Sequence, residues 1–443
     1  MNRRLFAASM AFVSFLGLWA LDFEGYSLQP VMVSAESSSG LEAIYVVPGG
    51  QPSARIIYEA SSQQVRWYRF SNLGGAYAEE VATDHSGSRW SIPVAGTDMG
   101  YIIEDGSTRH CYWVVDYQAH RFDVSALTAS PAEDCGRTIL AVDGDASPIP
   151  YYSINGRRME LSRELNLSYS TLAFDEGSFA YSLVPAEITL AGIGGSTVIN
   201  SPLCNTSFRL EGDRFLRAWN SAVEVESEVY TTVAVEAQTK ASNMHQAADN
   251  EQSDQSGDLG GSAPCEVRFE AAVSDAAIFT EWQISRSAEF EDVDDRYTEL
   301  AFDYTFTESG TTYVRFVANN AGGNCEFVGT TYEIFIGESK LEIPNAFTPQ
   351  SSPGVNDEWK VSYKSLVSYE CHIFNRWGTR LFSSTEPSEG WDGKYRGKFV
   401  PAGVYYYVIK AVGADGVKYE RAGDINIINF TGTDNGSAGT ETE

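Results

Sequence analysis

The sequence predicts an all-β protein made of β-sandwich domains in tandem. The chain is rich in residues that favour strands and turns, with 24 tyrosines, 23 phenylalanines and 39 glycines among 443 residues. Short β-branched or aromatic segments recur along it, and glycine, aspartate, serine and proline separate them at regular intervals. The length suits three or four domains rather than one.

The net charge of −29 and the isoelectric point of about 4.5 argue against two classes of partner. An acidic chain repels the phosphates of nucleic acids and the headgroups of anionic lipids, so we expect neither nucleic-acid binding nor charge-driven membrane binding. Hydrophobic residues make up 43% of the chain, which is too large a share for a disordered protein.

Residues 1–35 are predicted to hold a secretory signal peptide. Arg3 and Arg4 precede sixteen uncharged, mostly apolar residues at 5–20. A run of this length spans only about 24 Å as a helix, so an uncleaved membrane anchor is the weaker alternative. Cleavage can follow residue 20 or residue 35, and we expect the chain to pass through the inner membrane.

Two β-sandwich domains are predicted at 36–135 and 136–239. The pair Asn155-Gly156 predicts a hairpin with a type I′ turn, in which both residues need positive φ. Eight segments of this region read as strands: Ala43–Val47, Ala54–Tyr58, Gln64–Phe70, Cys111–Tyr117, Thr138–Val142, Leu165–Tyr169, Phe179–Val184 and Glu228–Val235.

Two further segments are predicted to lack a core. Residues 240–264 contain almost no large apolar side chain, so they cannot offset the entropy of ordering the chain, and we expect a flexible linker. Residues 431–443 are expected to form a disordered tail.

Six cysteines follow the leader, and export permits disulfides. Closeness in sequence predicts the pair Cys265–Cys325 and, with less support, the pair Cys111–Cys135. The pairing of Cys204 and Cys371 is left open.

A third, smaller sandwich is predicted at 265–339. Its strands alternate, Trp282 is a candidate core aromatic, and Gly310 follows the turn in TFTESGTTYVRF. These features resemble the immunoglobulin-type modules known as PKD-type domains. The fold class predicted for the whole chain is therefore a tandem array of immunoglobulin-like β-sandwiches.

The block at 340–430 carries the most specific motifs. They occur in the order IPNAFTP, GVNDEWK, IFNRWG, WDGK and PAGVYYYVIKA, at 343–349, 354–360, 373–378, 391–394 and 401–411. Together they resemble the gliding-motility-associated C-terminal domain, the type B sorting signal of type IX secretion.

This resemblance implies transport across the outer membrane, followed by display at the cell surface or release. It also implies two partners, namely the type IX secretion machinery and an outer-membrane β-barrel of the PorP/SprF type. The sorting and docking motif then comprises Pro344, Asn345, Phe347, Pro349, Asn356, Asp357, Asn375, Arg376, Trp377, Gly378, Trp391, Asp392, Gly393, Gly403 and Tyr405.

One departure from the family concerns the turn after the FTP motif. The family has Asn-Gly-Asp-Gly there, whereas this chain has Gln350 to Gly354. Asn356 and Asp357 remain, but two oxygen side chains are too few for a calcium site, so we expect them to cap the turn. The sequence predicts no metal site and no cofactor.

Arg376 and Trp377 have two interpretations. Arginine and tryptophan are enriched at binding hot spots, and the block at 340–430 is near neutral, with eleven basic and ten acidic residues. Alternatively, Trp377 fills the core and Arg376 pairs with a carboxylate; for Trp377 the core position is slightly favoured.

In the last motif, strand alternation places Tyr405 and Tyr407 on one face, and Val404, Tyr406 and Val408 on the other.

No nucleophile elbow, HExxH motif or P-loop occurs, so the sequence predicts a non-enzymatic cell-surface or secretion-associated structural protein. Two alternatives stay open. One is a surface adhesin or glycan-binding protein whose N-terminal domains contact a host or biofilm ligand; the other is a secreted hydrolase with an unrecognised N-terminal domain. Three aromatic pairs are candidate platforms for stacking sugars: Trp67-Tyr68, Tyr112-Trp113 and Tyr151-Tyr152.

Overall fold

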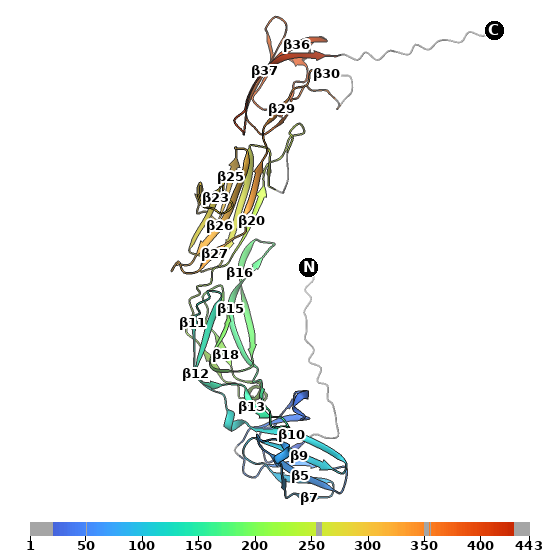
Figure 1. The fold of residues 1–443 in the computed structure, drawn as a ribbon, viewed down its shortest axis with the longest axis vertical. Helices are drawn as coiled ribbons and strands as arrows, with labels where there is room; N and C mark the ends of the chain where they lie inside the picture. The colour runs from blue at the N-terminus through green and yellow to red at the C-terminus, as the bar shows by residue number, and fades with distance from the viewer. Residues whose placement is uncertain (1–20, 50, 254–258, 350–353, 355, 429–443) are drawn as a thin grey trace, which may run out of the picture. The chain divides into compact units, whose positions relative to one another are not determined.

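Strands make up most of the chain that the computed structural model describes, which confirms the predicted all-β class (Figure 1). The described residues are 21–49, 51–253, 259–349, 354 and 356–428. The first twenty residues of the leader predicted at 1–35 and the tail predicted at 431–443 lie outside them.

The chain divides into two units, which are Met1–Thr171 with Leu183–Thr232 and Leu172–Ser182 with Val233–Glu443. Unit 1 begins with a sandwich of two sheets. The six-stranded sheet has the order β2 (Val31–Ser34), β3 (Ala43–Val47), β10 (Thr108–Asp116), β9 (Met99–Asp105), β5 (Val65–Phe70) and β6 (Glu79–Val81). The four-stranded sheet has the order β1 (Asp22–Glu24), β4 (Arg55–Glu59), β8 (Arg89–Pro93) and β7 (Asp84–Ser86). Three 3-10 turns accompany them: η1 (Ser37–Ser39), η2 (Gly75–Tyr77) and η3 (Tyr117–His120).

Both faces of the six-stranded sheet are buried. Along β10, Cys111, Trp113 and Val115 face one core, while Tyr112 and Val114 face the other, which is shared with the four-stranded sheet. This explains why the sequence of β3 is continuously apolar, because a strand covered on both faces has no side that benefits from polar residues.

The first two strands favour the earlier of the two predicted cleavage sites. Leu21 and Phe23 are buried, and the ring of Phe23 lies 5.2 Å from that of Tyr45. Cleavage after residue 35 would remove β1 and β2 and expose this core. We therefore expect N-terminal sequencing of the exported protein to find a start close to residue 21. A mature chain that starts at residue 36 would contradict this.

The second sandwich of unit 1 follows from β11. One sheet has the order β11 (Asp123–Pro131), β12 (Arg137–Ala146) and β17 (Ile193–Asn200). The other has the order β16 (Ala180–Leu190), β15 (Leu165–Asp175), β18 (Arg209–Glu211) and β19 (Glu224–Glu226). A hairpin of β13 (Ile149–Tyr152) and β14 (Arg158–Leu161) and the helix α1 (Arg214–Ala218) pack against the first sandwich.

The boundary predicted between residues 135 and 136 is wrong. It falls in the turn between β11 and β12, which pair from Asp123↔Asp145 to Pro131↔Thr138. The first sandwich therefore ends near His120, where η3 ends.

The hairpin predicted at Asn155-Gly156 is confirmed, but its turn type is not. Gly156 has a φ of 77°, whereas Asn155 is not among the described residues with positive φ. The Ser153 N–H donates to the Arg157 carbonyl at 2.9 Å, so the loop is longer than the two-residue turn expected.

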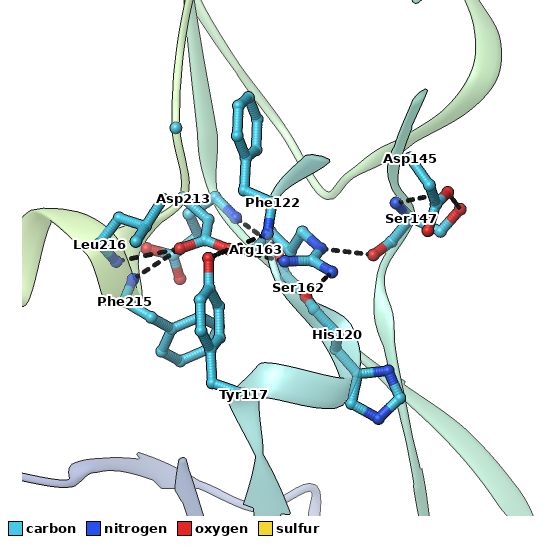
Figure 2. Close-up of polar contacts among 12 residues, drawn as sticks. Tyr117, His120, Phe122, Asp145, Ser147, Ser162, Arg163, Asp213, Phe215 and Leu216 are labelled. Carbon is cyan, nitrogen blue, oxygen red and sulfur yellow. Dashed lines mark hydrogen bonds and ion pairs between the residues drawn. The ribbon is translucent and has the colours of Figure 1, made fainter. Parts of the chain in front are cut away.

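A buried ion pair links the two sandwiches of unit 1. Arg163 donates to Asp213 Oδ2 at 2.7 Å, and the two side chains are 2% and 0% exposed. The same guanidinium donates to the carbonyls of Ser147 and His120, and the Tyr117 hydroxyl donates to Asp213 (Figure 2). Figure 2 also shows Asp213 at the start of α1, where it accepts from two backbone N–H groups. Each nitrogen of the guanidinium and each oxygen of the carboxylate therefore has a hydrogen-bond partner in one of the two domains or in the segment between them.

The third sandwich lies in unit 2. Its sheets have the orders β20-β22-β25 and β21-β28-β26-β23-β24, with β27 paired to β26. Trp282 is fully buried in its core, as predicted. The strands are β20 (Ala237–Asn243), β21 (Gly260–Gly261), β22 (Cys265–Val273), β23 (Phe279–Ser285), β24 (Asp295–Tyr297), β25 (Ala301–Phe306), β26 (Gly310–Asn319), β27 (Glu326–Val328) and β28 (Tyr332–Ile336).

The flexible linker predicted at 240–264 is wrong for the described residues. Its first residues belong to β20, which pairs along its length with β22, so this domain begins near residue 237 rather than 265. Asn250 then donates to the carbonyls of Val361 and Pro387, both at 2.8 Å. The Gln252 N–H donates to the Tyr363 carbonyl at 2.7 Å. A segment with almost no large apolar side chain is thus held by hydrogen bonds to the C-terminal domain.

Both predicted disulfides are wrong, because Cys265 and Cys111 are free and buried. Cys265 pairs with Phe306 at one end of its domain, whereas Cys325 follows β26, about 30 Å further along. Cys111 faces the first core, whereas Cys135 lies in the turn between β11 and β12. The cysteines that are disulfide-bonded are Cys135 and Cys325.

Candidate docking surface of the C-terminal domain

The C-terminal domain is built on a five-stranded sheet. Its order is β30 (Ala346–Phe347), β37 (Lys418–Ile427), β36 (Gly403–Gly413), β32 (Leu366–Phe374) and β33 (Arg380–Ser384). Two small sheets accompany it: β29 (Lys340–Glu342) with β31 (Ser362–Lys364), and β34 (Lys394–Tyr395) with β35 (Lys398–Phe399). One face of the main sheet carries the domain's core.

Motif residues that lie far apart in the sequence meet in this core. The ring of Trp391 lies 5.6 Å from that of Phe347 and 5.4 Å from that of Tyr405. The indole N–H of Trp359 donates to the carbonyl of Pro344 at 2.7 Å. Four of the predicted motifs therefore hold the domain together, and their part in sorting stays a prediction.

Other motif residues shape the backbone around that core. Asn345 accepts from the backbone of Asn426, which joins β30 to the sheet edge. Gly393 has a φ of 74°, and a Cβ at this position would lie 3.1 Å from Pro349 Cγ. The Tyr405 hydroxyl donates to the carbonyl of Pro401 at 2.7 Å.

The side chain of Asp357 caps the turn that precedes Trp359. Asp357 Oδ2 accepts from the Gly354 N–H, and the Asn356 carbonyl accepts from the Thr348 N–H at 2.9 Å. Asn356 has a φ of 52°, a conformation that asparagine adopts more readily than most residues. For Asp357 this agrees with the capping role predicted from the sequence.

The NRWG motif forms a tight turn that projects two side chains outward. Asn375 Oδ1 accepts from the N–H groups of Trp377 at 3.0 Å and Thr379 at 2.9 Å, and Gly378 supplies a φ of 79°. Trp377 is 74% exposed, so the core position favoured from the sequence is wrong. The Arg376 guanidinium lies 4.3 Å from the centre of the Trp377 ring. The tryptophan that fills the core is Trp391, which is 1% exposed.

A groove of about 630 Å³ runs beside this turn. Arg376 and Trp377 lie on its wall, and Gly403 lies at the start of β36 within it. Val404 and Tyr406 were predicted only to share one face of their strand, and Tyr395 comes from the stretch at 394–399 in which cations and aromatics alternate. These lining residues are mainly apolar: Leu381, Tyr395, Val400, Pro401, Val404 and Tyr406.

The two faces of β36 differ as the alternation predicted. Tyr405 is buried and Tyr407 is half-buried against the core. On the opposite face Val404, Tyr406 and Val408 are exposed, at 47%, 46% and 38%. An apolar stripe therefore continues from the groove along the open face of the sheet.

Local hydrogen bonds keep two carboxylates of the domain ionised. Burial acts to raise the pKa of Asp392, but hydrogen bonds from the side chain and backbone of Lys394 outweigh it and lower that pKa below its usual value. Asp415 behaves alike, because hydrogen bonds from Ser339 lower its pKa against the effect of burial. Burial raises the pKa of the Cys371 thiol to about 11, so this thiol stays protonated at neutral pH.

The aromatic pairs considered as sugar platforms lie mostly in the cores. Trp67, Tyr112, Trp113 and Tyr151 are at most 1% exposed, so none of them offers a flat face to a ligand. Among the described residues, no group of three or more metal-ligating side chains occurs. In the same part of the chain, no helix is long and apolar enough to cross a membrane.

Two family models match the chain. Residues 341–427 match a type IX secretion signal domain, and residues 127–227 match a fibronectin type III domain. The first match confirms the family predicted for the C-terminal block. The likeness of 265–339 to PKD-type modules stays a prediction. No curated protein matches the chain.

Solved structures give only distant similarities. Fibronectin(III)-like modules of CbhA from Clostridium thermocellum align at 9% identity over 43% of this chain and 95% of that chain, with a TM-score of 0.17. Dimeric latent PorU from Porphyromonas gingivalis aligns at 11% identity over 72% and 35%, with a TM-score of 0.15. The BSP domain of a biofilm associated protein aligns at 9% identity over 94% and 97%, with a TM-score of 0.15. Scores this low carry no argument about function.

The fold and the family matches define an all-β protein of tandem immunoglobulin-like sandwiches. Its C-terminal domain is a type IX secretion signal domain, which implies recognition by the type IX machinery and export to the cell surface or the extracellular space. Both matched families are non-catalytic kinds of domain.

Proposed function

We propose that this chain is a non-enzymatic structural protein of the cell surface, held there by docking of its C-terminal domain to an outer-membrane β-barrel of the PorP/SprF type. The observation that carries the proposal is the match of residues 341–427 to a secretion signal domain. The fold of this domain is maintained by buried motif residues, while the NRWG turn presents Arg376 and Trp377 to solvent.

In this proposal the sandwich domains act as a stalk or spacer and catalyse no reaction. The buried Arg163–Asp213 pair stiffens the junction of the first two sandwiches, and the hydrogen bonds of Asn250 and Gln252 join the third sandwich to the docking domain. Both features favour a stalk or spacer over an enzyme, because they restrict motion where an active-site cleft between domains would need it.

Deleting residues 340–443 should abolish surface display and leave the protein in the periplasm, because the truncated chain lacks the signal domain. Protease shaving of intact cells, followed by fractionation, measures the display. The full-length chain is the control, and trypsin resistance of the periplasmic form shows that the remaining domains are folded. Display of the truncated chain at the full-length level would end the proposal.

A further inference from the structure

The groove beside the NRWG turn combines an apolar floor with a cationic rim. Leu381, Val400 and Val404 contribute aliphatic surface, and Tyr395 and Tyr406 contribute aromatic surface. Three cations lie over aromatic rings around it: Arg376 over Trp377 at 4.3 Å, Arg396 over Tyr395 at 5.2 Å and Lys394 over Phe399 at 4.7 Å.

Most of this positive charge is not neutralised within the protein. Lys394 forms an ion pair with Asp392 at 2.7 Å. Within the described part of the chain, Arg376, Arg396 and Lys398 form no ion pair with a carboxylate. Their charges are exposed at the edge of an apolar surface, where a partner's carboxylates would be attracted to the rim while its apolar side chain enters the groove.

Two polar groups of the groove that could recognise a sugar are already in use. Asn375 Oδ1 accepts two hydrogen bonds from its own turn, and the Tyr405 hydroxyl donates to Pro401. A glycan site needs several free, fixed polar groups, whereas an apolar groove with a charged rim suits a protein segment.

We propose that this groove binds an acidic segment of a partner protein, in which carboxylates flank a bulky apolar side chain. Trp377 and Arg376 are the main contacts: the free side of the indole packs on the apolar anchor, and the guanidinium pairs with a carboxylate. The inference rests on the proposed function in that it gives the chemistry of the docking partner's contact segment.

Peptide binding to the full-length protein tests this directly. The probe is a capped peptide in which one phenylalanine is flanked by two glutamates on each side, and saturation-transfer NMR or calorimetry gives its Kd. We expect at least tenfold weaker binding after Trp377→Ala and after Arg376→Gln. Binding should weaken similarly when the peptide's glutamates become glutamines or its phenylalanine becomes alanine.

Two matched variants control for the loss of an exposed aromatic and of an exposed cation. Tyr77→Ala removes a tyrosine that is 72% exposed in the first sandwich. Lys418→Gln removes an exposed cation at the far end of β36, where Lys418 pairs with Val412. Both should bind the peptide as the wild type does.

Three results would overturn the inference. The first is equal binding of the glutamine peptide. The second is binding of polygalacturonate, rather than the peptide, that is lost in Trp377→Ala, which would assign the groove to an anionic glycan. The third is self-association of the wild type, lost in Trp377→Ala by sedimentation, which would assign it to a second copy of the chain.

Surface display separates this inference from the proposed function. If the 340–443 deletion abolishes display while Trp377→Ala and Arg376→Gln keep both display and capture of a barrel identified by mass spectrometry, export by this domain stands and the groove is not its docking contact.

Discussion

Replacing Arg163 with methionine is expected to lower the free energy of unfolding by about 3–5 kcal/mol. The substitution keeps a long side chain but leaves the Asp213 carboxylate charged and fully buried, with only the Tyr117 hydroxyl and two backbone N–H groups as partners. The carbonyls of His120 and Ser147 also lose their donor. Breaking a buried pair by removing one partner is costly because the other charge stays in a medium that solvates it poorly.

Chemical denaturation of the full-length protein, followed by hydrogen exchange of residues 21–232, measures this effect. Arg209→Met is the matched control, because Arg209 pairs with Glu224 while both side chains are about half exposed, and its loss should cost less than about 1 kcal/mol. The double variant Arg163→Met/Asp213→Leu should recover part of the loss, since it removes the stranded charge. A cost for Arg163→Met no larger than that for Arg209→Met would show that the pair does not hold the junction.

Trp391→Ala should destabilise the C-terminal domain by about 3–5 kcal/mol, whereas Trp377→Ala should change its stability by less than about 0.5 kcal/mol. Trp391 is 1% exposed, packs on Phe347 and Tyr405, and donates its indole N–H to the Lys394 carbonyl at 3.0 Å. Trp377 is 74% exposed, so its removal leaves no cavity.

Hydrogen exchange of residues 341–427 in the full-length protein compares the two tryptophans under identical conditions. If the amides of Trp391→Ala stay as protected as those of the wild type, or if Trp377→Ala loses strong protection, then Trp391 is not the core tryptophan and Trp377 is not the surface one. The comparison also supports the peptide experiment, because it establishes that weaker binding by Trp377→Ala does not arise from unfolding.

Local sequence patterns were sufficient to predict part of this structure. The alternation in PAGVYYYVIKA correctly separated Tyr405 from Val404, Tyr406 and Val408, because successive side chains of any strand point to opposite faces; that Tyr405 faces the core is seen only in the structure. Trp282 was likewise found in its core, since it lies within a run of strand-forming residues. The secretion signal domain was identified from several motifs in a fixed order.

The candidate docking surface could be predicted only in part from local patterns. The NRWG motif identified Arg376 and Trp377 as candidate contacts. Whether a tryptophan in a turn is buried, however, depends on the direction in which its side chain points from that turn. Here the backbone N–H groups of Trp377 and Thr379 donate to Asn375 Oδ1, and the turn that they form directs the indole away from the core. The groove itself is assembled from β33, β36 and the β34–β35 hairpin, which meet only in the folded domain.

By itself the sequence determined the all-β class, the immunoglobulin-like architecture and the secretion signal domain, because these depend on composition, on period-two alternation and on ordered motifs. The tertiary structure alone decided that β11 belongs to the second sandwich, that Asn250 and Gln252 are tied to the C-terminal domain, and that Cys265 and Cys111 are free. The physical reason is common to all three. Which strands pair, where a polar segment finds hydrogen-bond partners, and which thiols come within bonding distance depend on contacts between residues far apart in the chain, and no local pattern encodes them.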